Sequence, residues 1–106
     1  MKMISRSDFD IIVSKGVVVV DFYAKECASC RKLASQIALA AMEMQGSGVD
    51  MIRVNIHDDF ELAHDYGIKD VPTTLILKDG KTMKQLQGYF PKEILVNELE
   101  VALNQI

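Results

Sequence analysis

Cys27 and Cys30 are the residues of this 106-residue chain best suited to chemistry, because two thiols separated by two residues can close one disulfide bond. The thiolate is the reactive form, and a free cysteine with a pKa of about 8.5 is mostly thiol at neutral pH. A helix that begins at the pair would favour the thiolate through its unpaired N–H groups and its dipole. Cys27, at the exposed end of such a helix, could attack a substrate disulfide, and Cys30 could then attack the mixed disulfide that forms.

Other uses of two cysteines are open at this point. They could be structural thiols in the core, half of a zinc site, or ligands of an iron–sulfur cluster shared by two chains. His57 and His64 do not have zinc-finger spacing, because 26 residues separate Cys30 from His57 where about 12–15 are typical. A Cys-x-x-Cys pair within a strand–helix–strand pattern favours a redox dithiol without a metal.

The composition is that of an ordinary globular chain with a mild negative charge. Hydrophobic residues make up 49% and charged residues 25%, and 12 Lys and Arg stand against 15 Asp and Glu. There is no basic stripe to predict nucleic-acid binding or an anionic membrane surface. The apolar stretches are far shorter than the roughly 20 residues of a membrane-spanning helix, and the first residues lack the apolar segment of a signal peptide. We therefore expect one domain over residues 1–106, a cytoplasmic monomer with neither nucleic acid nor membrane as a partner.

The expected strands have a clear centre. Val17–Tyr23 is rich in β-branched residues and apolar on both faces, which is typical of a strand that is covered on both sides. Asp79-Gly80 is a two-residue hairpin signal between two further strands. The other expected strands are residues 2–4, 51–56, Thr73–Lys78 and 81–88.

The longest expected helix covers residues 28–45, where apolar side chains recur at spacings of three and four until Gly46. It follows the central strand directly, so that the cysteine pair lies on a strand-to-helix turn. The other expected helices run from an N-cap at Ser7 to Ser14, from Asp58 or Asp59 to Gly67, and from Pro91 towards the C-terminus. The order βαβαβαββα predicts an α/β fold, with a mixed sheet and helices on both of its faces.

Three segments of the chain resemble the thioredoxin family. Residues 17–34, VVVVDFYAKECASCRKLA, look like the family's apolar strand and active-site helix, and residues 66–73, YGIKDVPT, resemble the segment around its cis-proline. Residues 75–81, LILKDGK, are similar to the strand and hairpin that follow, and Gly88 stands where a glycine is usual before the last helix. The likeness covers essentially the whole chain and implies the thioredoxin fold, a five-stranded mixed sheet flanked by four helices.

The resemblance also implies an activity, which is reversible thiol–disulfide exchange with disulfide-containing protein substrates. Cys27 would be the nucleophile and Cys30 the resolving thiol. No organic cofactor or metal is implied in the domain, because the dithiol itself carries the electrons, which a partner of the thioredoxin-reductase type would supply. We therefore expect a thiol–disulfide oxidoreductase that reduces protein disulfides.

Three further residues match positions that have a role in the family. Asp21 matches its buried aspartate, and a carboxyl desolvated in an apolar strand has a raised pKa and can exchange a proton with Cys30. The alternative is that Asp21 ends the strand and faces solvent. Pro72 matches the cis-proline, and the backbone of Val71 would bond to a substrate strand opposite Cys27. Without that role, Val71 and Pro72 would simply begin a strand.

The residues beside the cysteines depart from the family pattern and should tune the redox chemistry. Glu26 stands where Trp is usual, so that a negative charge replaces a flat apolar surface and disfavours the Cys27 thiolate. Ala28 and Ser29 replace Gly-Pro, which adds one backbone N–H and one hydroxyl near the sulfurs. We expect these donors to stabilise the reduced form and to make the couple more oxidising than a typical thioredoxin.

Ser35 and Arg53 also depart from the pattern. Ser35 replaces the proline that kinks the active-site helix, which should leave that helix straighter. Arg53 aligns with a lysine near the buried aspartate, and a guanidinium that reached Asp21 would favour the ionised carboxylate. An exposed strand arginine is the equally simple alternative.

The reductase interpretation leaves two alternatives. The Ala28-Ser29 dipeptide is compatible with a more oxidising disulfide oxidase or isomerase. The groove expected near Cys27, Val71 and Pro72 could also bind peptides with little turnover.

Overall fold

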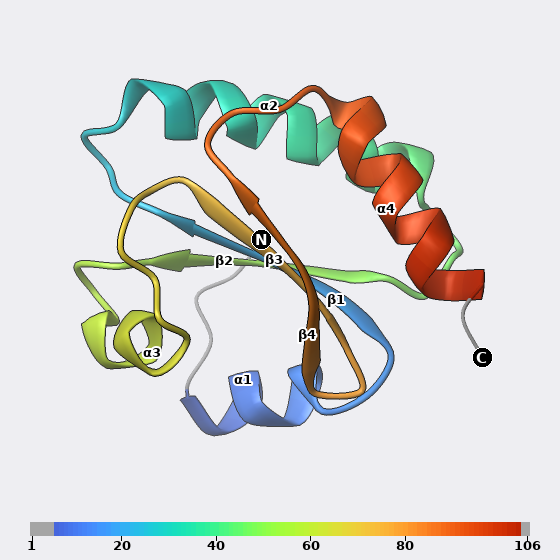
Figure 1. Cartoon of the computed structure of the whole chain (residues 1–106), viewed down its shortest axis with the longest axis horizontal. Helices are drawn as coiled ribbons and strands as arrows, with labels where there is room; N and C mark the ends of the chain where they lie inside the picture. Colours follow the sequence, from blue (N-terminus) through green and yellow to red (C-terminus); the bar gives the residue numbers. More distant parts are fainter. Residues whose placement is uncertain (1–5, 105–106) are drawn as a thin grey trace.

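A four-stranded mixed sheet forms the centre of the structure, a computed structural model that describes residues 6–104 (Figure 1). Its strands are β1 Val17–Tyr23, β2 Asp50–Asn55, β3 Thr73–Lys78 and β4 Lys81–Gln87. They lie in the order β2-β1-β3-β4. β1 is parallel to β2, whereas β1 with β3 and β3 with β4 are antiparallel.

Two helices cover each face of this sheet. The helices are α1 Arg6–Val13, α2 Ala28–Glu43, α3 Phe60–Asp65 and α4 Lys92–Asn104. Figure 1 shows α1 and α3 below the sheet, and α2 and α4 above it. The α/β fold and the order of its elements are confirmed over the described part of the chain, whereas the expected fifth strand, residues 2–4, lies outside it.

β1 is buried on both faces, as its run of β-branched residues predicted. Val18 and Val20 belong to the core cluster between the sheet and the helices α1 and α3. Val17 and Val19 belong to the cluster on the side of α2 and α4. Because alternate side chains of a strand point to opposite faces, Asp21 lies on the face that α2 and α4 cover.

Side chains close the turns that the sequence predicted. Asp79 and Gly80 have φ angles of 51° and 86° and join β3 to β4 as a two-residue hairpin. The Asp79 carboxylate also accepts a hydrogen bond of 2.9 Å from the N–H of Gly16, which ties the hairpin to the start of β1. Asp59 caps α3, because its side chain accepts a hydrogen bond from the N–H of Leu62.

α2 is the longest described helix, with 16 residues, and it continues through Ser35 without a break. It ends at Glu43, two residues before the predicted end, because the chain turns at Met44 and the N–H of Ser47 donates to the carbonyl oxygen of Met44. Among residues 6–104, no helix is long and apolar enough to cross a membrane.

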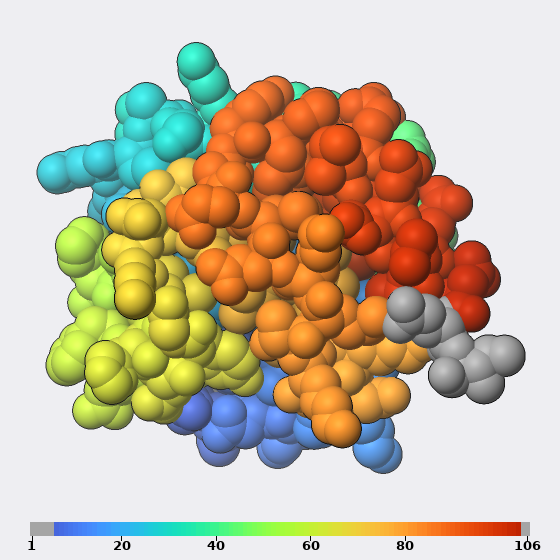
Figure 2. Space-filling model, in the orientation of Figure 1, coloured from blue at the N-terminus to red at the C-terminus, as the bar shows by residue number. Residues whose placement is uncertain are grey.

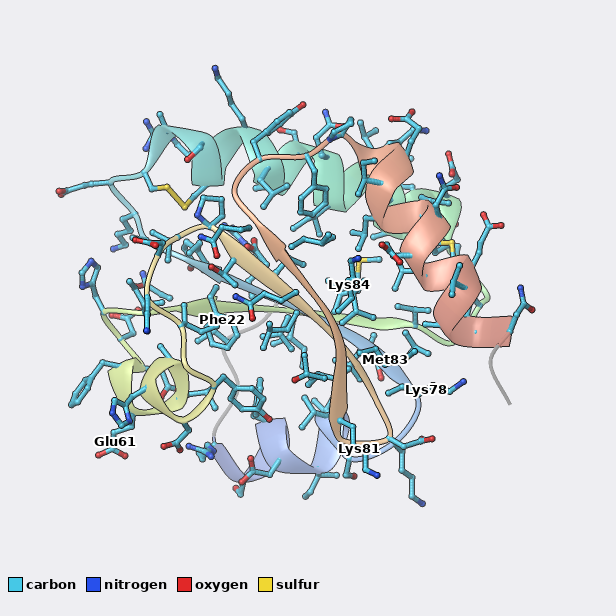
Figure 3. All side chains as sticks on the ribbon, viewed as in Figure 1. Phe22, Glu61, Lys78, Lys81, Met83 and Lys84 are labelled. Atoms are coloured by element: carbon cyan, nitrogen blue, oxygen red, sulfur yellow. A yellow bond between two sulfur atoms is a disulfide. The ribbon has the colours of Figure 1, made fainter. Side chains whose placement is uncertain are left out.

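β4 forms an edge of the described sheet and carries mostly exposed side chains. Figure 2 shows these side chains, in orange, across the middle of one face of the molecule. Figure 3 labels Lys81 and Lys84 on this strand, and the ammonium group of Lys84 lies 3.4 Å from the carboxylate of Glu98 on α4. Charged side chains on an edge strand oppose pairing with a strand of another chain.

The core between α2 and the sheet allows a matched test of burial. Leu33 is fully buried on α2, whereas Leu39 on the same helix is 45% exposed. We expect Leu33→Ala to lower the free energy of unfolding by about 2–5 kcal/mol, because it leaves a cavity, and Leu39→Ala to change it by about 0.5 kcal/mol or less. Urea denaturation of the oxidised proteins measures both values, and equal losses would contradict the described packing of α2.

Candidate active site

The cysteine pair lies where the chain leaves β1 and begins α2. Cys27 is the N-cap of α2, with the extended backbone angles φ −143° and ψ 104°. Its sulfur accepts a hydrogen bond of 3.2 Å from the backbone N–H of Cys30. An N–H of the first helical turn, which has no carbonyl partner within the helix, is therefore directed at the Cys27 sulfur. This arrangement favours a thiolate at this position.

Cys27 and Cys30 are joined by a disulfide bond, and their Cα atoms are 5.2 Å apart (Figure 3). The two sulfurs differ in access: Cys27 is partly exposed, whereas Cys30 is 1% exposed. A substrate can therefore reach the first cysteine and not the second. No group of three or more His, Cys, Asp or Glu side chains that could hold a metal ion occurs between residues 6 and 104.

An open groove of about 870 Å³ lies in front of Cys27. It brings together four residues that the sequence singled out, Glu26, Ala28, Ser29 and Val71. Its other two lining residues are Lys32, which the sequence marks only as a positive charge that favours the Cys27 thiolate, and Tyr89, which the sequence did not single out. Tyr89 is 50% exposed, and the signal that could have identified it is an aromatic residue directly after Gly88. The groove is therefore lined by apolar, polar and charged groups together.

The Val71–Pro72 peptide bond is cis, as the resemblance implied. Pro72 is buried, and its carbonyl oxygen accepts a hydrogen bond of 2.9 Å from the N–H of Gly88. Within the described residues, no hydrogen bond occupies the backbone N–H or carbonyl group of Val71. Val71 can therefore offer both groups to an extended chain in the groove.

Asp21 is 1% exposed, so the alternative that it faces solvent is wrong. Its Oδ2 accepts a hydrogen bond of 3.1 Å from Nε of Arg53, which confirms that the guanidinium reaches this carboxyl. Arg53 is one-quarter exposed and lies 3.8 Å above the ring centroid of Tyr23. Burial raises the pKa of Asp21, and the charge and hydrogen bond of Arg53 lower it by less, so that the pKa remains raised.

Ser29 and Arg31 extend the polar surroundings of the pair. The hydroxyl of Ser29 lies 3.5 Å from the sulfur of Cys27, within hydrogen-bonding distance for a sulfur atom. The Arg31 guanidinium donates to the backbone carbonyl of Lys25. Glu26 is exposed at the mouth of the groove and forms no ion pair with the described residues, so water screens its charge.

The raised pKa of Asp21 predicts a pH-dependent effect on stability. At a pH between the unfolded and the folded pKa, the folded chain holds a proton on Asp21 that the unfolded chain releases. Asp21 therefore lowers the free energy of unfolding progressively as the pH rises from about 3.9, the pKa of an unfolded aspartate, through the raised pKa of the folded state. We expect Asp21→Asn to gain stability relative to the unaltered protein between pH 4 and pH 8. Urea unfolding of the oxidised proteins measures this, with exposed Asp50→Asn as control; an equal difference at both pH values would contradict it.

Comparisons with known proteins agree with this site. The thioredoxin family model matches residues 1–101. The chain is 32% identical over 96 residues to a thioredoxin of Chlamydia caviae, covering 91% of this chain and 92% of that protein. It is 33% identical over 97 residues to a thioredoxin of Bacillus subtilis, covering 90% and 92%.

Solved structures share the fold. A mutant thioredoxin from Halobacterium salinarum superposes with a TM-score of 0.84 at 23% identity, over 96% of this chain and 88% of that one. Fasciola hepatica thioredoxin gives 0.78 at 25% identity, over 91% and 89%. With its Cys27–Cys30 disulfide, the chain belongs to the thioredoxin family and is a thiol–disulfide oxidoreductase.

Proposed function

We propose that this protein works as a reductant of protein disulfides, with Cys27 as the nucleophile and Cys30 as the resolving thiol. The main support for the assigned roles is that the two sulfurs differ in their exposure to solvent. Cys27 lines the groove and is partly exposed, whereas Cys30 is buried in the first turn of α2. Only a bond formed on Cys27 would be open to a protein substrate.

The reaction begins from the reduced pair. The Cys27 thiolate attacks one sulfur of the substrate disulfide, a mixed disulfide forms, and the other substrate sulfur leaves as a thiolate that takes a proton from water. The Cys30 thiolate then attacks the Cys27 sulfur, which closes the Cys27–Cys30 disulfide and releases the second substrate thiolate. Two electrons pass from the protein dithiol to the substrate.

The groove binds the substrate as an extended segment. The backbone N–H and carbonyl of Val71 pair with it, and the Tyr89 ring offers it half-exposed apolar surface on the same groove. Pro72 shapes the chain beside Val71. Glu26 adds a negative charge, which weakly favours substrates with a positive charge close to their disulfide.

Asp21 serves as the acceptor of the Cys30 proton. It lies on the sheet face that α2 covers, and Cys30 is the buried residue in the first turn of that helix. A carboxyl with a raised pKa is a better proton acceptor for a thiol than an exposed aspartate, because the two pKa values are closer.

A partner reductase of the thioredoxin-reductase type returns the pair to the dithiol, and the domain itself uses no organic cofactor or metal. We place the protein in the cytoplasm, because a reduced dithiol persists where the compartment is kept reducing. This location follows from the reductant role.

Single-cysteine variants test the assigned roles. We expect Cys27→Ser and Cys30→Ser both to reduce insulin at the uncatalysed rate in the presence of dithiothreitol. When reduced Cys30→Ser is freed of dithiothreitol and mixed with the oxidised substrate, it should accumulate a mixed disulfide, visible by mass spectrometry, because its partly exposed Cys27 can attack and no second thiol resolves the product. Cys27→Ser should form none, since Cys30 is buried.

Two outcomes would contradict these roles. A mixed disulfide on Cys30 of the Cys27→Ser variant would reverse them. An intact protein that binds the substrate and leaves its disulfides oxidised would favour a peptide-binding module.

Ser29 favours a more oxidising couple, because its hydroxyl lies 3.5 Å from the Cys27 sulfur and can donate to the thiolate of the reduced form. We expect Ser29→Ala to lower the reduction potential by about 10–30 mV, which corresponds to one ordinary hydrogen bond. Equilibration with a glutathione redox buffer measures the potential. Ser35→Ala, on the exposed side of the same helix, is the control and should leave it unchanged. A potential that stays the same or rises in Ser29→Ala would remove this role.

A further inference from the structure

The carboxyl of Asp21 has a second oxygen, Oδ1, to which Arg53 donates no hydrogen bond. Arg53 donates to Oδ2, whereas Oδ1 is buried and has no hydrogen-bond partner among the described residues. The hydroxyl oxygen of Thr74 is in the same condition. Asp21 is 1% exposed and Thr74 0% exposed, so neither group can turn to bulk solvent. Two buried polar atoms without partners in one core are uncommon, because each loses its hydrogen bonds with water.

The register of the sheet places these two residues together. Asp21 lies directly opposite Thr74 in the antiparallel pairing of β1 with β3. Directly opposite residues of an antiparallel pair project their side chains on the same face, with Cβ atoms about 4.5–5.5 Å apart. The two oxygens are not bonded to each other as the structure places them. At that separation, a rotation of the Thr74 side chain to another staggered rotamer or one bridging water molecule would let the hydroxyl and the carboxyl share a hydrogen bond.

The neighbouring Thr73 differs from Thr74 because its hydroxyl has hydrogen-bond partners. The hydroxyl of Thr73 lies within hydrogen-bonding distance of the carbonyl oxygen of Asp70 and of the side chain of Gln87. Its side chain projects from the opposite face of β3, since consecutive residues of a strand alternate. Of the two adjacent hydroxyls, the one beside Asp21 is the one that is not otherwise engaged.

We propose that Thr74 is a positioning residue for the proton-accepting carboxyl, with its hydroxyl as the second hydrogen-bond partner of Asp21. A hydroxyl can both donate and accept, so it donates to Oδ1 of the carboxylate and accepts from Oδ1–H of the protonated acid. Arg53 can only donate, so it supports the ionised form alone. Thr74 thereby allows the carboxyl to change its protonation state without leaving a buried oxygen unpaired. The catalytic part of this role rests on the proposed function of Asp21.

The electrostatic surroundings of Asp21 are simple enough for a clear test. Arg53, from β2, is the one charged group of the described residues that shifts its pKa. The group facing it from β3 is the neutral Thr74. The one buried titratable residue of α2 is Cys30, which is engaged in the disulfide of the oxidised protein. The effect of a substitution at Thr74 on the titration midpoint of Asp21 should therefore not be confused with the titration of a neighbouring group.

The first measurement follows the Asp21 carboxyl carbon by NMR as a function of pH in the oxidised protein. We expect Thr74→Val, which keeps the shape and removes the hydroxyl, to move the titration midpoint to higher pH. Both forms of the carboxyl lose the hydroxyl, but the ionised form loses more, because a hydrogen bond to a charged group is stronger than one to a neutral acid. Thr74→Ser, which keeps the hydroxyl, should titrate like the unaltered protein, and so should Thr82→Val, an exposed control on β4.

The second measurement is the rate at which the mixed disulfide is resolved as a function of pH. For Thr74→Val, we expect a roughly three- to tenfold lower rate below the midpoint and an unchanged rate well above it, because one hydrogen bond biases the protonation equilibrium. Thr74→Ala replaces Thr74→Val if the valine variant does not fold, which urea denaturation checks.

The outcomes separate this inference from the function on which it rests. A midpoint that is the same in Thr74→Val and the unaltered protein overturns the positioning role, as does a Thr74→Ser protein that behaves like Thr74→Val. A shifted midpoint together with resolution rates that do not follow it supports the hydrogen bond and overturns its catalytic part. An unaltered protein that reduces no disulfide, with the midpoint still shifted, contradicts the proposed function and leaves the pairing standing.

Discussion

The side chains of β1 are covered on both faces of the sheet, and the chain must emerge from this core within a few residues of its end. This emergence creates the site. Ala24 is still buried, Lys25 and Glu26 are exposed, and α2 begins with Cys27 as its cap. One turn of helix then carries Cys30 back into the core. The difference in access between the two sulfurs is therefore a consequence of where a buried strand meets a helix that packs on it.

The same burial decides the chemistry of Asp21. A carboxyl in the middle of an apolar sheet must be neutral, paired or both, because an isolated buried charge is unstable. Arg53, opposite it on β2, supplies a partner but remains partly exposed over the ring of Tyr23. The pair is thus asymmetric: the Arg53 side chain remains about one-quarter exposed to water, whereas the Asp21 carboxyl loses nearly all of its hydration. This is why desolvation outweighs the ion pair and the pKa of Asp21 stays raised.

The sequence was sufficient to predict the features that local patterns determine. The β-branched run of β1, the cap at Asp58 or Asp59 and the hairpin at Asp79 each depend on a few neighbouring residues. All of them are observed, with Asp59 as the cap. The cis bond before Pro72 came from family resemblance, because the cis form is a minority state that local sequence does not determine. The approach of Arg53 to Asp21 could only be posed as an alternative, because it depends on the pairing of strands 32 residues apart in the chain.

Tyr89 shows most clearly why the rest of the groove could not be predicted. Its place depends on three connections made by residues distant in sequence. Gly88, with φ of 77°, turns the chain at the end of β4 and donates its N–H to Pro72, and the N–H of Lys92 donates to the Gln36 side chain of α2. Phe90 is buried between these two attachments. The segment that carries Tyr89 is therefore held at both ends and in the middle.

In the proposed function, this attachment supplies apolar surface for a substrate where the chain has no tryptophan beside the nucleophile. The aromatic ring that lines the groove lies on the β4–α4 segment, whereas Glu26 makes the side of the groove beside Cys27 polar. A charge that is exposed and screened adds little binding energy, but a rigid aromatic ring buries area at a small entropic cost. In the proposed reaction, the position of the substrate is accordingly set by Val71 and Tyr89, and Glu26 acts mainly on the Cys27 thiolate and on which charged substrates approach it.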